Sequence, residues 1–260
     1  MRRRLPGGFT VVELVVVVAI TALLLSILMP ALASVRASGR GAVCISNLRQ
    51  MAIAAQRYAL EYQFFPPAIR YENDGEFTNV AWDWITTYDR VISPGPLWQF
   101  TDDPDRVQQC PEYGGETNFA ERFTGYNYNT TYIGGESDFP QTGWEPFCRG
   151  VRYSVCRRTA RVAIFGDGGV VGSIANKFMR APMNQPQECP PSAQGGLGVV
   201  YGGGQAFRHQ HATYVAYLDL HVAAAHDPFR GVHATEGLLE TLGYPDNGFL
   251  SDDDRAYDPR

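Results

Sequence analysis

The sequence of 260 residues lacks the surplus of basic residues that nucleic-acid-binding proteins carry. Lysine and arginine total 22 against 27 aspartates and glutamates, so the net charge is −5 with neutral histidines. Binding to a phosphate backbone depends on a basic surface, so this balance disfavours DNA and RNA as partners. We therefore expect no nucleic-acid partner.

Cysteine is scarce, and its spacing lacks the C-x-x-C pair of zinc ribbons and thioredoxin-like sites. Disulfides are expected only if the chain is exported from the cytoplasm. In that case four cysteines can form two disulfides with three connectivities, of which Cys148 with Cys156 closes the shortest loop. The other two of these four are Cys110 and Cys189, and Cys44 is left unpaired.

The signatures of common enzyme classes are also missing. Ser154, Ser173 and Ser192 lack the G-x-S-x-G setting of a nucleophilic serine, and the glycines at 202–204 lack the lysine of a P-loop. The acidic runs at 102–105 and 252–254 lack the ligand spacing of an EF-hand; we interpret them as solvated surface, with calcium binding as the alternative. We predict no catalytic residue, no cofactor and no enzymatic activity.

A long apolar run stands at the N-terminus. Residues 2–4 are arginines, and Glu13 is the only charged residue from Phe9 to Ala33. As a helix, that stretch would be about 37 Å long, which is enough to cross a bilayer. Basic residues before the run predict that the N-terminus is cytoplasmic and that the remainder lies outside the cytoplasm.

Glu13 separates two interpretations of this run. A secretory signal peptide would be cut after the A-x-A-like residues 31–33. However, a carboxylate at the start of an apolar run costs about 2.5–3.5 kcal/mol on insertion scales, and a disposable signal gains nothing from it. Cleavage before Phe9 would create an α-amino group that can pair with Glu13 of the same or a neighbouring chain. We favour this second interpretation.

The segment GFTVVEL at residues 8–14 resembles the type IV prepilin cleavage and methylation motif. The resemblance implies that a prepilin peptidase cuts after Gly8 and methylates the new amine of Phe9. It also implies that Glu13 guides subunits into a helical filament. Pro30 falls where pilins often carry a helix-kinking proline.

Beyond Pro30, apolar residues recur at three- and four-residue steps, which predicts one amphipathic helix face. This face comprises Cys44, Ile45, Leu48, Met51, Ala52, Ala55, Tyr58, Ala59 and Tyr62. We expect the opposite face to meet solvent or neighbouring chains; it carries Ser46, Asn47, Arg49, Gln50, Gln56, Arg57 and Glu61. The prolines at 66–67 end the helix, because the residue before a proline is pushed out of the helical region.

The segment CISNLRQ at residues 44–50 and a late histidine resemble a pilin-like group common in planctomycetes and related bacteria, whose members carry a His-x9-Asp-Gly motif. His209 and Asp219 match its histidine and aspartate, and Leu220 replaces its glycine. The resemblance favours a hydrogen bond between His209 and Asp219 across a hairpin. The alternative is a zinc site built from these two residues with His211 and His221. We predict no metal.

Two apolar segments predict buried strands, at 162–165 before a turn at 166–169 and at 212–218, and a third strand is expected near 199–201. We therefore predict an α+β, pilin-like fold, with a long N-terminal helix, half transmembrane and half amphipathic, packed on an antiparallel β-sheet. The expected parts are a leader (1–8), a transmembrane helix (9–33), an amphipathic helical spine (34–64), a globular domain (65–245) and a solvated acidic tail (246–260).

Together these features predict a type IV pilin-like or type II secretion pseudopilin-like subunit. We expect prepilin peptidase to process it and other pilin-like subunits to join it in an envelope filament. Its expected location is the bacterial inner membrane, crossed once, with the N-terminus in the cytoplasm and the globular domain outside. The alternative is an exported metal-binding protein or enzyme that uses the histidines between His209 and His233.

Overall fold

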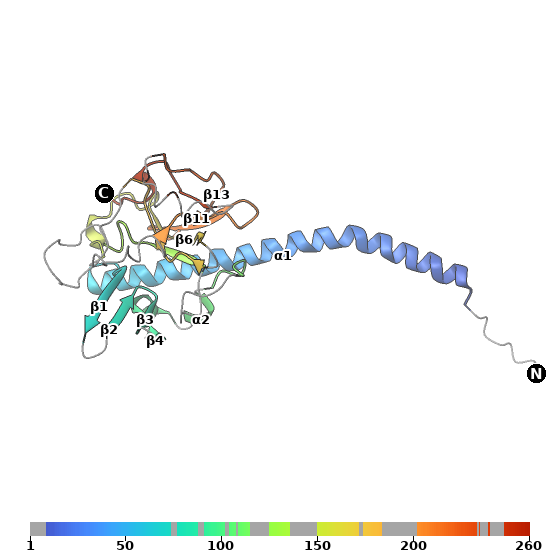
Figure 1. The fold of residues 1–260 in the computed structure, drawn as a ribbon, viewed down its shortest axis with the longest axis horizontal. Helices are drawn as coiled ribbons and strands as arrows, with labels where there is room; N and C mark the ends of the chain where they lie inside the picture. The colour runs from blue at the N-terminus through green and yellow to red at the C-terminus, as the bar shows by residue number, and fades with distance from the viewer. Residues whose placement is uncertain are drawn as a thin grey trace, which may run out of the picture. The chain divides into compact units, whose positions relative to one another are not determined.

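The structure is a computed structural model of the chain (Figure 1). It describes residues 9–73, 77–87, 91–101, 104–107, 109–114, 125–135, 150–171, 174–183, 202–232, 234, 239 and 247–260. Two compact units make up the chain, Met1–Arg40 and Gly41–Arg260. Several predicted features lie outside the described residues, namely Gly8, Cys148, Cys189, His233 and the strand near 199–201.

The predicted long helix is confirmed as α1 (Val11–Tyr62), which contains Pro30 without interruption (Figure 1). Its N-terminal part is long and apolar enough to cross a membrane. It begins with a capping box, in which the Glu13 backbone N–H donates to Thr10 Oγ1 at 3.2 Å and the Thr10 backbone N–H donates to Glu13 Oε2 at 2.8 Å. It ends at Tyr62, and the next residue, Gln63, has a φ of 67°, which lies outside the helical region.

Residues 41–62 of α1 belong to the unit Gly41–Arg260 and pack in its core. Most of the predicted apolar face is confirmed as buried, since Cys44, Leu48, Met51, Ala52, Ala55 and Ala59 are all at most 1% exposed. The prediction that Asn47 faces solvent is wrong. Its Nδ2 donates to the Tyr126 hydroxyl at 3.3 Å and to the Gln109 carbonyl at 3.2 Å, so the buried amide keeps its hydrogen bonds.

The helix shares its core with a six-stranded sheet in the order β10-β9-β5-β6-β12-β13. These strands are β5 (Tyr126–Asn129), β6 (Ala163–Asp167), β9 (Phe178–Met179), β10 (Gly202–Gly203), β12 (Thr213–Tyr217) and β13 (Val222–Ala225). Neighbouring strands pair antiparallel along β5-β6-β12-β13, whereas β9 pairs parallel with both β5 and β10. The α+β class is confirmed, but the sheet is mixed rather than antiparallel.

Strands β6 and β12 confirm two of the predicted strands, but the turn predicted at 166–169 is wrong. Gly166 continues β6, because it pairs with Asn127 of β5 on one side and with Val215 of β12 on the other. A Cβ atom at this position would lie 2.1 Å from the Gln205 side-chain oxygen, so a larger residue would require the end of that side chain to move. Asp167 therefore ends a central strand instead of lying in an exposed loop.

Smaller elements surround this layer. A four-stranded antiparallel sheet comprises β1 (Ile69–Asn73), β2 (Phe77–Ala81), β3 (Trp84–Thr86) and β4 (Val91–Pro94). Two-stranded pairs join β7 (Val170–Val171) to β8 (Ile174–Ala175) and β11 (Gln205–Ala206) to β14 (Asn247–Gly248). The short helices are η1 (Pro96–Phe100), α2 (Pro104–Val107), η3 (Tyr153–Val155) and η4 (Asp254–Ala256).

The prediction of a solvated C-terminal tail is wrong for the described residues 247–260. Phe249 and Tyr257 are fully buried and belong to a second core cluster with strands of the main sheet. Tyr257 is held at both ends, since its hydroxyl accepts from the Leu250 N–H at 2.8 Å and its carbonyl accepts from Asn129 Nδ2 at 2.9 Å. Within the acidic run, Asp254 accepts hydrogen bonds from the Tyr132 hydroxyl and the Met183 N–H, at 2.6 Å and 2.8 Å.

Candidate functional site

Two predicted assembly residues lie at the start of α1. Phe9 is 73% exposed and precedes the helix, whereas Glu13 lies in its first turn. The capping box was not predicted, although its signature T-x-x-E is present at residues 10–13. Glu13 therefore has a local partner in Thr10, whose backbone N–H and hydroxyl both donate to Oε2 at 2.8 Å.

The predicted hydrogen bond between His209 and Asp219 is wrong. His209 precedes β12 in a two-residue turn closed by backbone bonds to Ala212, and its side chain reaches Asp167 instead. Asp219 follows β12 and bonds to His221 Nδ1 at 2.5 Å. The strand separates the two motif residues, so its length prevents the contact.

The turn that the motif glycine would form is nevertheless present. Leu220 adopts a φ of 74°, and its N–H donates to the Tyr217 carbonyl at 2.9 Å. A left-handed leucine is strained, and its half-buried side chain packs against the main core. The turn between β12 and β13 is therefore kept without glycine.

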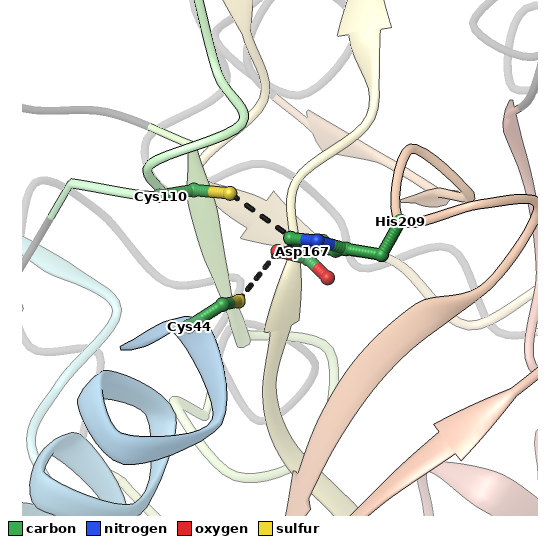
Figure 2. A group of neighbouring side chains, drawn as sticks. All are labelled: Cys44, Cys110, Asp167 and His209. Atoms are coloured by element: carbon green, nitrogen blue, oxygen red, sulfur yellow. Dashed lines mark hydrogen bonds and ion pairs between the residues drawn. The ribbon is translucent and has the colours of Figure 1, made fainter. Parts of the chain in front are cut away.

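A cluster of Cys44, Cys110, Asp167 and His209 is the main candidate site (Figure 2). The cysteines come from α1 and from the segment after α2, Asp167 ends β6, and His209 lies in the turn before β12. Asp167 Oδ1 lies 3.3 Å from both Cys44 Sγ and His209 Nε2, and Cys110 Sγ lies 3.5 Å from the same nitrogen. All four residues are buried.

The fold fixes the cluster through its neighbours. The Tyr214 N–H donates to Asp167 Oδ2 at 2.8 Å, which leaves Oδ1 facing the other three side chains. Gly125, with a φ of 121°, passes close to Cys110, where a Cβ atom would lie 2.9 Å from the cysteine Cβ. Glycine is favoured at that position by both its backbone conformation and the space.

Burial and mutual contacts shift the pKa values of the cluster. Burial raises the pKa of the Cys44 thiol, and its hydrogen bond to Cys110 raises it further. The same bond lowers the pKa of Cys110 to about 6 although burial opposes the shift, and His209 adds to the lowering. Burial disfavours a charged His209, but Asp167 and Cys110 outweigh it and raise the pKa of His209 to about 9.

The zinc site considered around His209, His211, Asp219 and His221 is not formed. His211 is exposed, and the Asp219–His221 pair is exposed beyond the other end of β12 from His209. Among the residues that the structure describes, the cluster around Asp167 is the group of histidine, cysteine and acidic side chains that lie close enough together to share a metal ion. A thiol nucleophile would need access to substrate, which the buried sulfurs of this cluster do not have.

The two disulfides considered for an exported chain are not formed, because Cys110 and Cys156, two of the four cysteines that they need, are free thiols. Cys156 Sγ contacts the Arg152 carbonyl at 3.6 Å instead. Cys44, expected to be left over, lies in the candidate site, because its helix face packs against β6.

Only His209 of the four cluster residues was singled out from the sequence as a site residue. The three contacts of the cluster join residues that are 123, 99 and 42 positions apart in the chain. Local spacing in the sequence cannot predict such a site, because each of its four residues comes from a different part of the fold. Their residue types, two cysteines with an aspartate and a histidine, were the one available signal.

No protein-family model, curated protein or solved structure matches this chain. We therefore infer the function of this chain from its own residues and their arrangement.

Proposed function

We propose that the chain is a type IV pilin-like or type II secretion pseudopilin-like subunit that assembles through its N-terminal helix. The observation that carries the proposal is the first half of α1. Every residue from 9 to 36 is exposed within its own unit, and Glu13 is the only charged residue from Phe9 to Val35. An apolar surface of this length is not stable in water, so lipid or neighbouring helices must cover it.

The position of Glu13 supports assembly rather than simple insertion. The bonds from Thr10 both reach Oε2, and among the described residues Oε1 accepts no hydrogen bond. Oε1 is therefore available for the α-amino group that cleavage after Gly8 would create on Phe9 of a neighbouring subunit. Pairing the two charges offsets part of the penalty of placing either one alone among apolar helices.

In this proposal the subunit crosses the inner membrane once, with its N-terminus in the cytoplasm before processing and residues 41–260 outside. Prepilin peptidase is its processing partner, and other pilin-like subunits are its assembly partners. The arginines at 2–4 support the orientation, since basic residues are retained on the cytoplasmic side.

Mass spectrometry of the mature N-terminus tests the proposal. We expect the protein from native membranes to begin at Phe9 and to carry an N-methyl group. Gly8→Ala should leave an uncut precursor of unchanged membrane abundance, because the processing enzymes of the resembled family mainly recognise the glycine before the cut. A mature protein that begins at Ser34 would instead identify a secretory signal and end the assembly proposal.

A further inference from the structure

The buried cluster has the shape of a metal-binding site. Its two sulfurs, ring nitrogen and carboxylate oxygen all lie within 4.8 Å of one another and point toward a common centre (Figure 2). The ligands of a tetrahedral zinc ion are about 3.3–3.8 Å apart, given Zn–S bonds of about 2.3 Å and Zn–N or Zn–O bonds of about 2.0–2.2 Å. The contacts of 3.3, 3.3 and 3.5 Å fall in that range. We propose that Cys44, Cys110, Asp167 and His209 bind one Zn²⁺ ion.

The residues around the cluster orient the ligands as in a metal site. Asp167 presents Oδ1 because the Tyr214 N–H holds Oδ2. On the opposite side, Asn47 Nδ2 donates to the Tyr126 oxygen at 3.3 Å, and the Tyr126 hydroxyl bonds to Cys44. The Tyr126 proton is thereby directed at the Cys44 sulfur. Such outer contacts fix ligand geometry and stabilise a thiolate.

Burial also favours a bound cation. Cys44, Cys110 and Asp167 have no exposed surface, and His209 is 7% exposed. Acidic groups in a core are stable when they are paired or coordinate a metal. A zinc ion with two thiolates and one carboxylate leaves the site with one negative charge, and the Arg208 guanidinium, which donates to the carbonyl of Gly168 next to Asp167, supplies a positive charge nearby.

The donor set selects zinc over harder cations. Calcium and magnesium take oxygen ligands, whereas thiolates with imidazole are typical of zinc. Four protein ligands leave no open position for substrate, so the site is structural rather than catalytic. The ion would join α1 to β6, to the segment after α2 and to the turn before β12. This inference does not depend on filament assembly or on cleavage after Gly8.

Metal analysis of the full chain, purified in detergent from its native membranes without chelator, tests the site. We expect inductively coupled plasma mass spectrometry to find one zinc ion per chain. After chelation, Co²⁺ alone should restore the intense visible bands of a tetrahedral site and a thiolate-to-cobalt charge-transfer band.

Matched variants locate the ligands. Cys110→Ser and His209→Ala should each weaken zinc binding by about 100-fold or more, because each removes a direct ligand. Cys156→Ser and His211→Ala change the same residue types outside the cluster and should bind as the unmodified chain does. Tyr126→Phe should keep one zinc at saturation but bind it about 10-fold more weakly, as expected for an outer contact.

Asp167→Asn is a variant that should still fold, because an amide has the same shape as the carboxylate and can still accept the hydrogen bond from the Tyr214 N–H. It therefore separates loss of zinc binding from misfolding. We expect it to keep the far-ultraviolet circular dichroism of the unmodified chain while its affinity for zinc falls.

Three results would overturn the proposal. The first is an unmodified chain that neither contains zinc nor develops cobalt bands. The second is a Cys110→Ser chain that binds zinc normally. The third is a Cys44–Cys110 disulfide in the native protein, seen as a cross-linked peptide lighter by two hydrogens.

Discussion

At the scale of single residues, Glu13 combines two roles that its position alone does not separate. It closes a capping box with Thr10, and in the proposed filament it also supplies a negative charge to a neighbouring subunit. Glutamine can accept the same capping bonds as glutamate but carries no charge. This difference allows the two roles to be tested separately.

We predict that Glu13→Gln leaves insertion, cleavage after Gly8 and the start of α1 intact but reduces assembly. The cationic amine of Phe9 would enter a low-dielectric helix bundle without an anionic partner, at a cost of several kcal/mol. Crosslinking between subunits in intact membranes, at equal abundance, is the measurement. Thr10→Ala is the control, since it weakens the cap but keeps the charge and should crosslink normally. Wild-type crosslinking of Glu13→Gln would show that the charge has no assembly role.

At the scale of elements, the end of α1 is set by an unfavourable residue. Gln63 has a φ of 67° at the position after the helix, where glycine is usual, and its side chain is exposed. A left-handed conformation costs a non-glycine residue about 1–2 kcal/mol. The prolines at 66–67 follow closely, so the helix ends there in spite of this strain.

We predict that Gln63→Gly raises the free energy of unfolding by up to about 1 kcal/mol, because relief of the strain exceeds the added freedom of glycine in the unfolded chain. Gln50→Gly makes the same chemical change at an exposed position inside α1 and should lower stability by about 0.5–1 kcal/mol. Thermal unfolding of both variants in one detergent measures the difference. A Gln63→Gly chain that is less stable than the unmodified protein would contradict the strain argument.

At the scale of the whole molecule, the C-terminal segment completes the unit Gly41–Arg260 rather than trailing from it. Phe249 and Tyr257 pack with Met179, Ala163 and Val215 of the main sheet. The backbone adds further bonds, since Arg157 N–H donates to the Pro259 carbonyl at 2.9 Å. Residues from the end of the chain therefore cover strands formed much earlier in it.

We predict that Tyr257→Ala lowers the free energy of unfolding by about 3–5 kcal/mol, as for other large core side chains. Tyr257→Phe is the matched variant; it removes only the oxygen that accepts from the Leu250 N–H and should cost about 1–3 kcal/mol. Urea unfolding of the full chain measures both. A solvated tail, as its acidic composition suggested, would make both substitutions silent.

The sequence by itself determined the features that depend on local pattern. The apolar run and the three- and four-residue steps predicted α1 to within two residues at each end, and apolar segments located β6 and β12. These predictions hold because the periodicity of helices and strands depends on residues that are close together in the sequence. That the first half is long and apolar enough to cross a membrane follows from the same local composition.

Only the tertiary structure decided which distant residues meet. The order β5-β6-β12 places Asp167 beside the turn that carries His209, and the packing of α1 brings Cys44 to the same point. The same packing buries Asn47 and assigns the C-terminal segment to a second core. Strand order and helix docking are set by the summed burial of many side chains, and no short stretch of sequence contains that information.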